Sequence, residues 1–135
     1  DIERIKSLFT LFTGENDYDK YFPVISIAVA QINKILLENA DKDDARLDML
    51  TASVANYRYV QMIASRMENI SAFDGKMLIS DKNSNAVKYA EEIMLDYMNL
   101  CSDLISQNSV FINTGGSYDW NYYKQHQKFS GKLWL

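Results

Sequence analysis

The strongest constraint on the fold is a run of apolar residues between residues 84 and 106. Its members alternate steps of four and three residues: Ala86, Ala90, Ile93, Tyr97, Leu100 and Leu104. On an α-helix this spacing places the side chains on one face. The sequence therefore predicts an amphipathic helix here, which needs other elements to cover its apolar stripe.

Two further helices are predicted in the first third of the chain. The first carries an apolar face made of Ile2, Ile5, Leu8, Phe9 and Phe12. It should end near Thr13 and Gly14, because glycine is the usual helix terminator. The second should begin around Tyr21 and continue to Leu36, with Pro23 in its first turn, where the missing N–H costs nothing.

The longest predicted helix extends from about Asp43 to Met67, after an acidic break in which Asp41 is the expected cap. Apolar residues occur on several of its faces, which predicts a position at the centre of the fold. Tyr57 and Tyr59 point about 200° apart, so we assign Tyr57 to the core and Tyr59 to an interface. For Arg58, between them, we expect an internal ion pair.

The helical spacing fails between residues 69 and 83. Asp74 and Gly75 form a pair that favours tight turns, and residues 76–80 have the composition of a short strand. We therefore expect a β-hairpin or a protruding extended loop before the last helix.

The end of the chain has a different composition. After a glycine hinge at 114–117, the segment contains three lysines (Lys124, Lys128 and Lys132) and one acid, Asp119. Six aromatic residues are interleaved with them: Tyr118, Trp120, Tyr122, Tyr123, Phe129 and Trp134. Such a segment can stack on nucleic-acid bases, dock on a protein neighbour, or cover the domain's own core.

The predicted fold class is mainly α. A small four-helix domain occupies residues 1–113, with the hairpin or extended loop before its last helix, and residues 114–135 form an extended C-terminal arm. The net charge is −4, of which the last 19 residues contribute about +2, so the body of the domain is acidic. No stretch has the roughly 18 apolar residues that cross a bilayer, so no membrane association is expected.

The sequence offers little for catalysis or metal binding. It contains one histidine, His126, and one cysteine, Cys101, which we expect to be a surface residue and a buried inert thiol respectively. Zinc sites need four ligands, and neither the acidic spacing of a calcium loop nor a phosphate-binding loop is present. We therefore predict no enzyme, no catalytic, cofactor or metal site, and no small-molecule substrate. A carboxylate pair among the 18 acids is the alternative left open.

The order of segments resembles a known family over about residues 15–107. The segments are 21–25 (YFPVI), the acidic break 41–44 (DKDD), 55–59 (ANYRY) and 73–80 (FDGKMLIS). In this order they resemble the head–tail connector proteins, also called head-completion or adaptor proteins, of long-tailed bacteriophages and prophages. The arm from residue 118 onward has no counterpart in that pattern.

The resemblance implies a structural protein of virion assembly. Such proteins form a ring, dock on the portal and other head–tail proteins, and leave a channel through which DNA passes. The resemblance also implies assembly in the bacterial cytoplasm, with incorporation into the virion of a functional phage. The expected interface residues are Phe73, Asp74, Gly75, Met77, Ile79, Phe111, Tyr118, Trp120, Tyr122, Tyr123, Phe129 and Trp134. The alternative is a nucleic-acid-binding or regulatory adaptor that uses the aromatic and basic arm.

Overall fold

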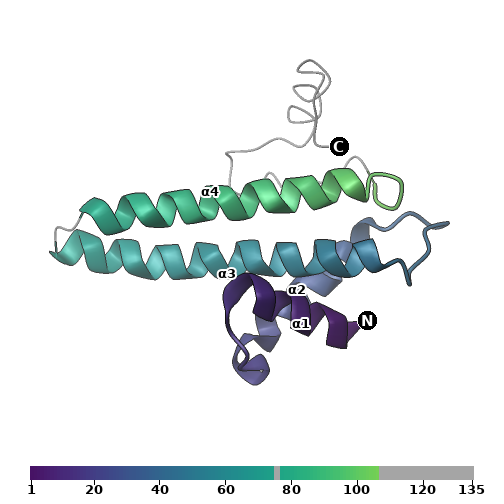
Figure 1. Cartoon of the computed structure of the whole chain (residues 1–135), viewed down its shortest axis with the longest axis horizontal. Helices are drawn as coiled ribbons and strands as arrows, with labels where there is room; N and C mark the ends of the chain where they lie inside the picture. The colour runs from purple at the N-terminus through teal and green to yellow at the C-terminus, as the bar shows by residue number, and fades with distance from the viewer. Residues whose placement is uncertain (75–76, 107–135) are drawn as a thin grey trace, which may run out of the picture.

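The computed structural model describes the backbone of residues 1–74 and 77–106, and the side chains of residues 1–66 and 85–106. It contains the helices α1 (Ile2–Thr13), α2 (Tyr18–Ile35), α3 (Ala45–Asp74) and α4 (Met77–Leu100). Helix α3 lies in the middle, with α4 along one side and α1 and α2 on the other (Figure 1). The mainly α fold class is therefore confirmed, and so is the central position of the longest helix.

Capping side chains set the boundaries of the first two helices. Gly14 ends α1 in the left-handed conformation, with φ 78°, as its sequence position predicted. Asp17 caps α2, and its side chain accepts a hydrogen bond from the Lys20 N–H. Because of this cap, α2 begins at Tyr18 rather than Tyr21, and Pro23 lies in the second turn.

In the loop before α3, two aspartate carboxylates each accept a backbone hydrogen bond. The Asp41 carboxylate accepts a hydrogen bond from the Asp43 N–H, which lies inside the loop. The carboxylate of Asp44, directly before α3, accepts the Arg46 N–H. The cap of α3 is thus Asp44 and not Asp41, and the helix begins at Ala45.

Helices α3 and α4 both extend further toward each other than predicted, whereas α4 ends at Leu100 and not near Ser106. Residues 77–80, where we expected a short strand, form the first turn of α4, and residues 75–76 lie outside the described part of the chain. Strand propensity depends strongly on having a pairing partner. The neighbour of this segment is the antiparallel helix α3, so the backbone satisfies its hydrogen bonds within the helix instead (Figure 1).

The buried face of α4 differs from the predicted stripe by about one residue. The side chains turned into the core are Ala90, Met94, Leu95, Met98 and Cys101. Ile93 and Tyr97 are only half-buried, and Leu100 is exposed. Helix α4 therefore has apolar residues on two adjacent faces, and the core uses the face that carries the flexible methionines.

After α4 the chain turns back and pairs with the end of α2. Leu36 and Ile105 form an antiparallel bridge. The Leu37 N–H donates to the Leu104 carbonyl at 3.0 Å, and the Ser106 N–H donates to the Ile35 carbonyl at 2.7 Å. In the described part of the chain, no helix combines the length and the apolar character needed to cross a membrane.

Candidate docking surfaces

An open apolar groove lies between α2 and α3. Its volume is about 920 Å³. It is lined by Lys20, Tyr21, Pro23, Val24, Ile27, Gln31, Arg58, Gln61, Met62, Ser65 and Arg66. Two of the apolar side chains are strongly exposed, Ile27 at 56% and Met62 at 43%. The lining contains three cations and no carboxylate. We call this surface the α2/α3 groove.

One end of the groove is supported by an aromatic cluster. The ring of Tyr59 packs edge-on against those of Phe9 and Tyr21, at centroid distances of 5.8 and 5.4 Å. Tyr59 is therefore partly buried against the core, and its assignment to an interface stays a prediction. Its ring extends the aromatic core that joins α1, α2 and α3.

The Glu15 carboxylate binds the hydroxyl groups of this cluster. It accepts hydrogen bonds from Tyr59 at 2.7 Å and from Tyr21 at 3.0 Å. These bonds, that from Tyr59 above all, hold the pKa of Glu15 below its ordinary value. Burial and the same bond raise the pKa of Tyr59 to about 12. Glu15 is thus a charged acceptor at neutral pH, and Tyr59 remains a donor.

A chain of polar contacts extends from the groove toward α4. Arg58 donates to the Gln61 side chain at 3.2 Å and lies over the ring of Tyr57. Gln61 in turn donates to the Tyr57 hydroxyl at 2.9 Å. Burial raises the pKa of Glu91, and hydrogen bonding to Tyr57 opposes the shift. Tyr57 is buried as predicted. The Glu91 carboxyl and the Tyr57 phenol are both buried between helices.

A second row of apolar side chains follows α4, and its Tyr97 ring packs edge-on against Phe12 of α1 at a centroid distance of 6.4 Å. Tyr89, Ile93, Tyr97 and Leu100 succeed one another at helical spacing, and we call these four residues the α4 stripe. Tyr89 is 64% exposed and Leu100 48% exposed. Asp96 lies beside the stripe, and lines with Ile93, Tyr97 and Leu100 a shallow hollow of about 290 Å³.

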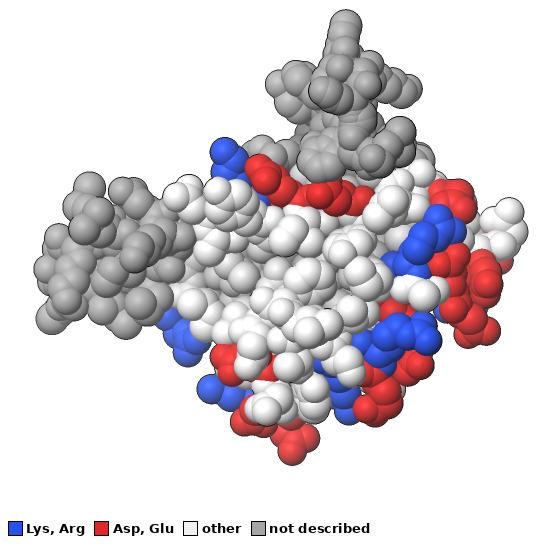
Figure 2. All heavy atoms as spheres, viewed as in Figure 1, with Lys and Arg blue, Asp and Glu red and all other residues white. Residues whose placement is uncertain are grey.

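The surface view shows how charge is distributed around these helices. In Figure 2 a broad area without charged side chains lies over the middle of α3 and α4, with both acidic and basic side chains along its upper edge. Most of the other charged side chains gather toward the lower and right-hand margins of this view. An exposed apolar patch rimmed by polar residues is typical of surfaces that bind other proteins.

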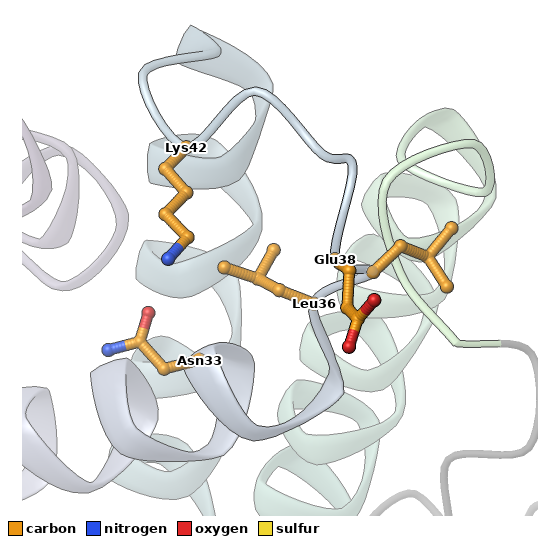
Figure 3. Close-up of a pocket in the computed structure, with 5 residues that line it drawn as sticks. Asn33, Leu36, Glu38 and Lys42 are labelled. Carbon is orange, nitrogen blue, oxygen red and sulfur yellow. The ribbon is translucent and has the colours of Figure 1, made fainter.

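A more polar hollow lies at the end of α2. Its volume is about 600 Å³, and it is lined by Asn33, Leu36, Leu37, Glu38 and Lys42. Figure 3 shows the Lys42 ammonium and the Asn33 amide facing each other, with Leu36 between Lys42 and Glu38. Its three polar side chains are all exposed, so water competes for each of them. Nothing here orients a nucleophile or a base.

Cys101 is fully buried, as predicted. Burial raises the pKa of its thiol to about 12, and the thiol donates to the Arg46 carbonyl at 3.4 Å. A protonated, enclosed thiol is a poor nucleophile. Among the described residues no group of three or more histidine, cysteine, aspartate or glutamate side chains is placed to hold a metal ion.

The structure describes the backbone of only some of the predicted interface residues. Phe73 and Asp74 lie in the last turn of α3, and Met77 and Ile79 lie in the first turn of α4, so these four come together at one end of the helix pair. Gly75 and the arm residues Phe111, Tyr118, Trp120, Tyr122, Tyr123, Phe129 and Trp134 lie outside the described residues, as does His126.

Sequence reasoning missed both of these candidate docking surfaces. The groove is formed by residues of two helices that are far apart in the chain, so no local pattern indicates it. For the α4 stripe a signal was present, since Tyr89, Ile93, Tyr97 and Leu100 are regularly spaced, but the same spacing was assigned to the core. Comparison with protein families, with curated proteins and with solved structures gave no match.

Proposed function

We propose that this chain is an assembly protein, whose helical domain binds other protein subunits, its own copies included, and catalyses no reaction. The observation that carries the proposal is a pair of apolar surfaces on different helices of one core. The α2/α3 groove exposes Ile27 and Met62, and the α4 stripe exposes Tyr89 and Leu100. Exposed apolar surface bordered by charge favours association with a protein partner.

The specific form of the proposal is a phage-type head–tail connector that forms a ring and docks on a portal protein. It is supported by the resemblance in segment order and by the number of surfaces. Rings are closed by head-to-tail contacts, and such contacts need two different, mutually complementary patches on each subunit. A groove and a stripe on different helices meet that requirement.

The test is a mass measurement in solution over a range of protein concentrations, followed by capture on an immobilised portal protein. We expect the mass to rise with concentration, or the chain to be retained by the portal. A chain that stays monomeric at the highest concentration and is not retained would contradict the proposal. Leu11→Glu is the control for a general effect of added surface charge. Leu11 is 81% exposed on α1 and lines neither surface, so this variant should associate like the wild type.

A further inference from the structure

The α2/α3 groove offers an occupant mainly apolar surface. Its three cations each have a partner within the domain: Lys20 lies over the Tyr21 ring, Arg58 lies over the Tyr57 ring, and Arg66 acts electrostatically on the Glu15 carboxylate. Much of the remaining lining is aliphatic: Pro23, Val24, Ile27 and Met62. A segment that is rich in aromatic side chains and poor in charge matches such a lining.

The chain after α4 returns to one end of this groove. Residues 35–37 lead away from α2, so the segment that pairs with them in the antiparallel sense leads back toward α2. Its last described residue, Ser106, donates its N–H to the Ile35 carbonyl. Ile35 follows the groove residues Ile27 and Gln31 at four-residue steps along α2, and it lies about 6 Å along the helix axis from Gln31. The rest of the chain therefore starts beside the groove.

The first aromatic group of the arm has a suitable composition. Residues 107–123 carry a single charge, Asp119, and the lysines of the arm all follow later. Burial of residues 118–123 therefore removes few charged groups from water. In an extended chain, side chains two residues apart lie on the same face, which for this segment are Tyr118, Trp120 and Tyr122. These three then span about 13 Å, and the groove extends about 16 Å along α2 from Lys20 to Gln31.

The length of the connecting chain favours the groove of the same copy. Twelve residue steps separate Ser106 from Tyr118, and fully extended they reach about 40 Å. The far end of the groove at Lys20 is about 22 Å along α2 from Ile35. A flexible chain of twelve steps has a root-mean-square length of about 20 Å, which is close to this span. Its effective concentration at the groove is therefore on the order of millimolar, and a second copy competes only near that concentration.

We propose that residues 118–123 of the arm bind in the α2/α3 groove of their own copy. The aromatic side chains cover Ile27 and Met62, and the lysines after residue 123 stay in water. This inference goes beyond the proposed function, because it concerns a single copy. Where the groove also serves assembly, a partner subunit must displace the arm, so the arm restrains assembly of the free chain.

Tryptophan fluorescence tests the contact, because both tryptophans of the chain, Trp120 and Trp134, lie in the arm. In the full-length chain, Trp134→Phe leaves Trp120 as the single reporter. Its emission should be blue-shifted relative to the urea-unfolded chain, because a bound indole is removed from water. The shift should stay the same on dilution, since the contact is made within one copy.

Two variants damage the groove in this Trp134→Phe background. Ile27→Glu and Met62→Glu each place a carboxylate on one wall, at positions that are 56% and 43% exposed. Each should abolish the blue shift while far-UV circular dichroism and thermal melting show a folded domain. Leu11→Glu adds the same charge at an exposed position of α1 that does not line the groove, so it should leave the emission unchanged.

Four outcomes would overturn the contact. An emission equal to that of the unfolded chain would show that Trp120 is not bound, and a blue shift that is lost on dilution would show that the arm binds a second copy. A blue shift that persists in both folded groove variants would place the arm elsewhere, and its loss in Tyr89→Glu instead would place it on the α4 stripe. None of these outcomes depends on whether the chain assembles, which the mass measurement tests separately.

Discussion

At the scale of single residues, Glu15 connects three parts of the domain. It lies in the loop after α1, and its carboxylate accepts hydrogen bonds from Tyr21 of α2 and Tyr59 of α3. Because these bonds favour the ionised form, the folded chain has a lower Glu15 pKa than the unfolded chain. The resulting stability is present above the unfolded pKa, and it is lost as pH falls through the folded pKa.

Tyr59→Phe tests this account. Removing the larger of the two hydrogen-bond contributions should raise the Glu15 pKa toward its ordinary value, and it should reduce the acid-induced loss of stability. An NMR titration of the Glu15 carboxyl carbon measures the first effect, and urea unfolding at several pH values measures the second. Tyr18→Phe is the control, because the Tyr18 hydroxyl contacts Thr10 instead. An unchanged Glu15 pKa in Tyr59→Phe would contradict the structure.

Cys101 provides a second prediction at this scale. Its thiol is enclosed and its pKa is about 12, so the reactive thiolate is scarce in the folded state. A thiol reagent at neutral pH should label the native protein slowly, at a rate that follows the opening of the fold, and the urea-unfolded protein fast. Equal labelling rates in the two states would show that the thiol is accessible.

At the scale of elements, the end of α1 depends on the conformation of Gly14. Its φ is 78°, and a Cβ atom added there meets nothing within 4 Å. Gly14→Ala should therefore cost about 1 kcal/mol of unfolding free energy, from backbone strain and not from a clash. Gly14→Asn should cost less, because asparagine tolerates the left-handed conformation better. Urea unfolding measures both; an equal loss in the two variants would point to another cause.

The number and order of the helices were predictable, because apolar spacing and caps are local properties of the sequence. The Gly14 terminator and the burial of Tyr57 and Cys101 followed from such local signals. The beginning of α2 differed from the prediction, although its signal, the Asp17 cap, is also local. The first turn of α4 and the packing of Tyr59 did not follow from local signals, because each depends on contact with another helix. The same reason applies to the α4 stripe. Two adjacent faces of α4 are apolar, and only packing against α3 determines which one is buried.

At the scale of the whole molecule, α3 connects all the other helices. Helices α1, α2 and α4 each pack chiefly against it, and α1 and α2 pack little against each other. The core residues Phe9 of α1 and Met98 of α4 are both fully buried in one cluster that includes residues of α3. Damage on either side of α3 should therefore weaken the same cooperative structure.

Phe9→Ala and Met98→Ala test this cooperativity. We expect losses of about 3–5 and about 2–5 kcal/mol of unfolding free energy respectively, from lost burial and the cavities left behind. In both variants, helix content measured by circular dichroism and labelling of the Cys101 thiol should report a single transition. Leu11→Ala, at an exposed position, should change stability by less than about 0.5 kcal/mol. Separate transitions for the two probes would show that the two sides of α3 unfold independently.

The bridge between Leu36 and Ile105 determines where the rest of the chain departs. Hydrogen bonds to Ile35 and Leu37 fix the backbone up to Ser106 at the end of α2. The 29 residues that follow are therefore tethered at a known point, and fully extended they reach at most about 100 Å from it. Any ligand of the arm is consequently held near this domain at a high effective concentration, whether that ligand belongs to the same copy or to an adjacent one.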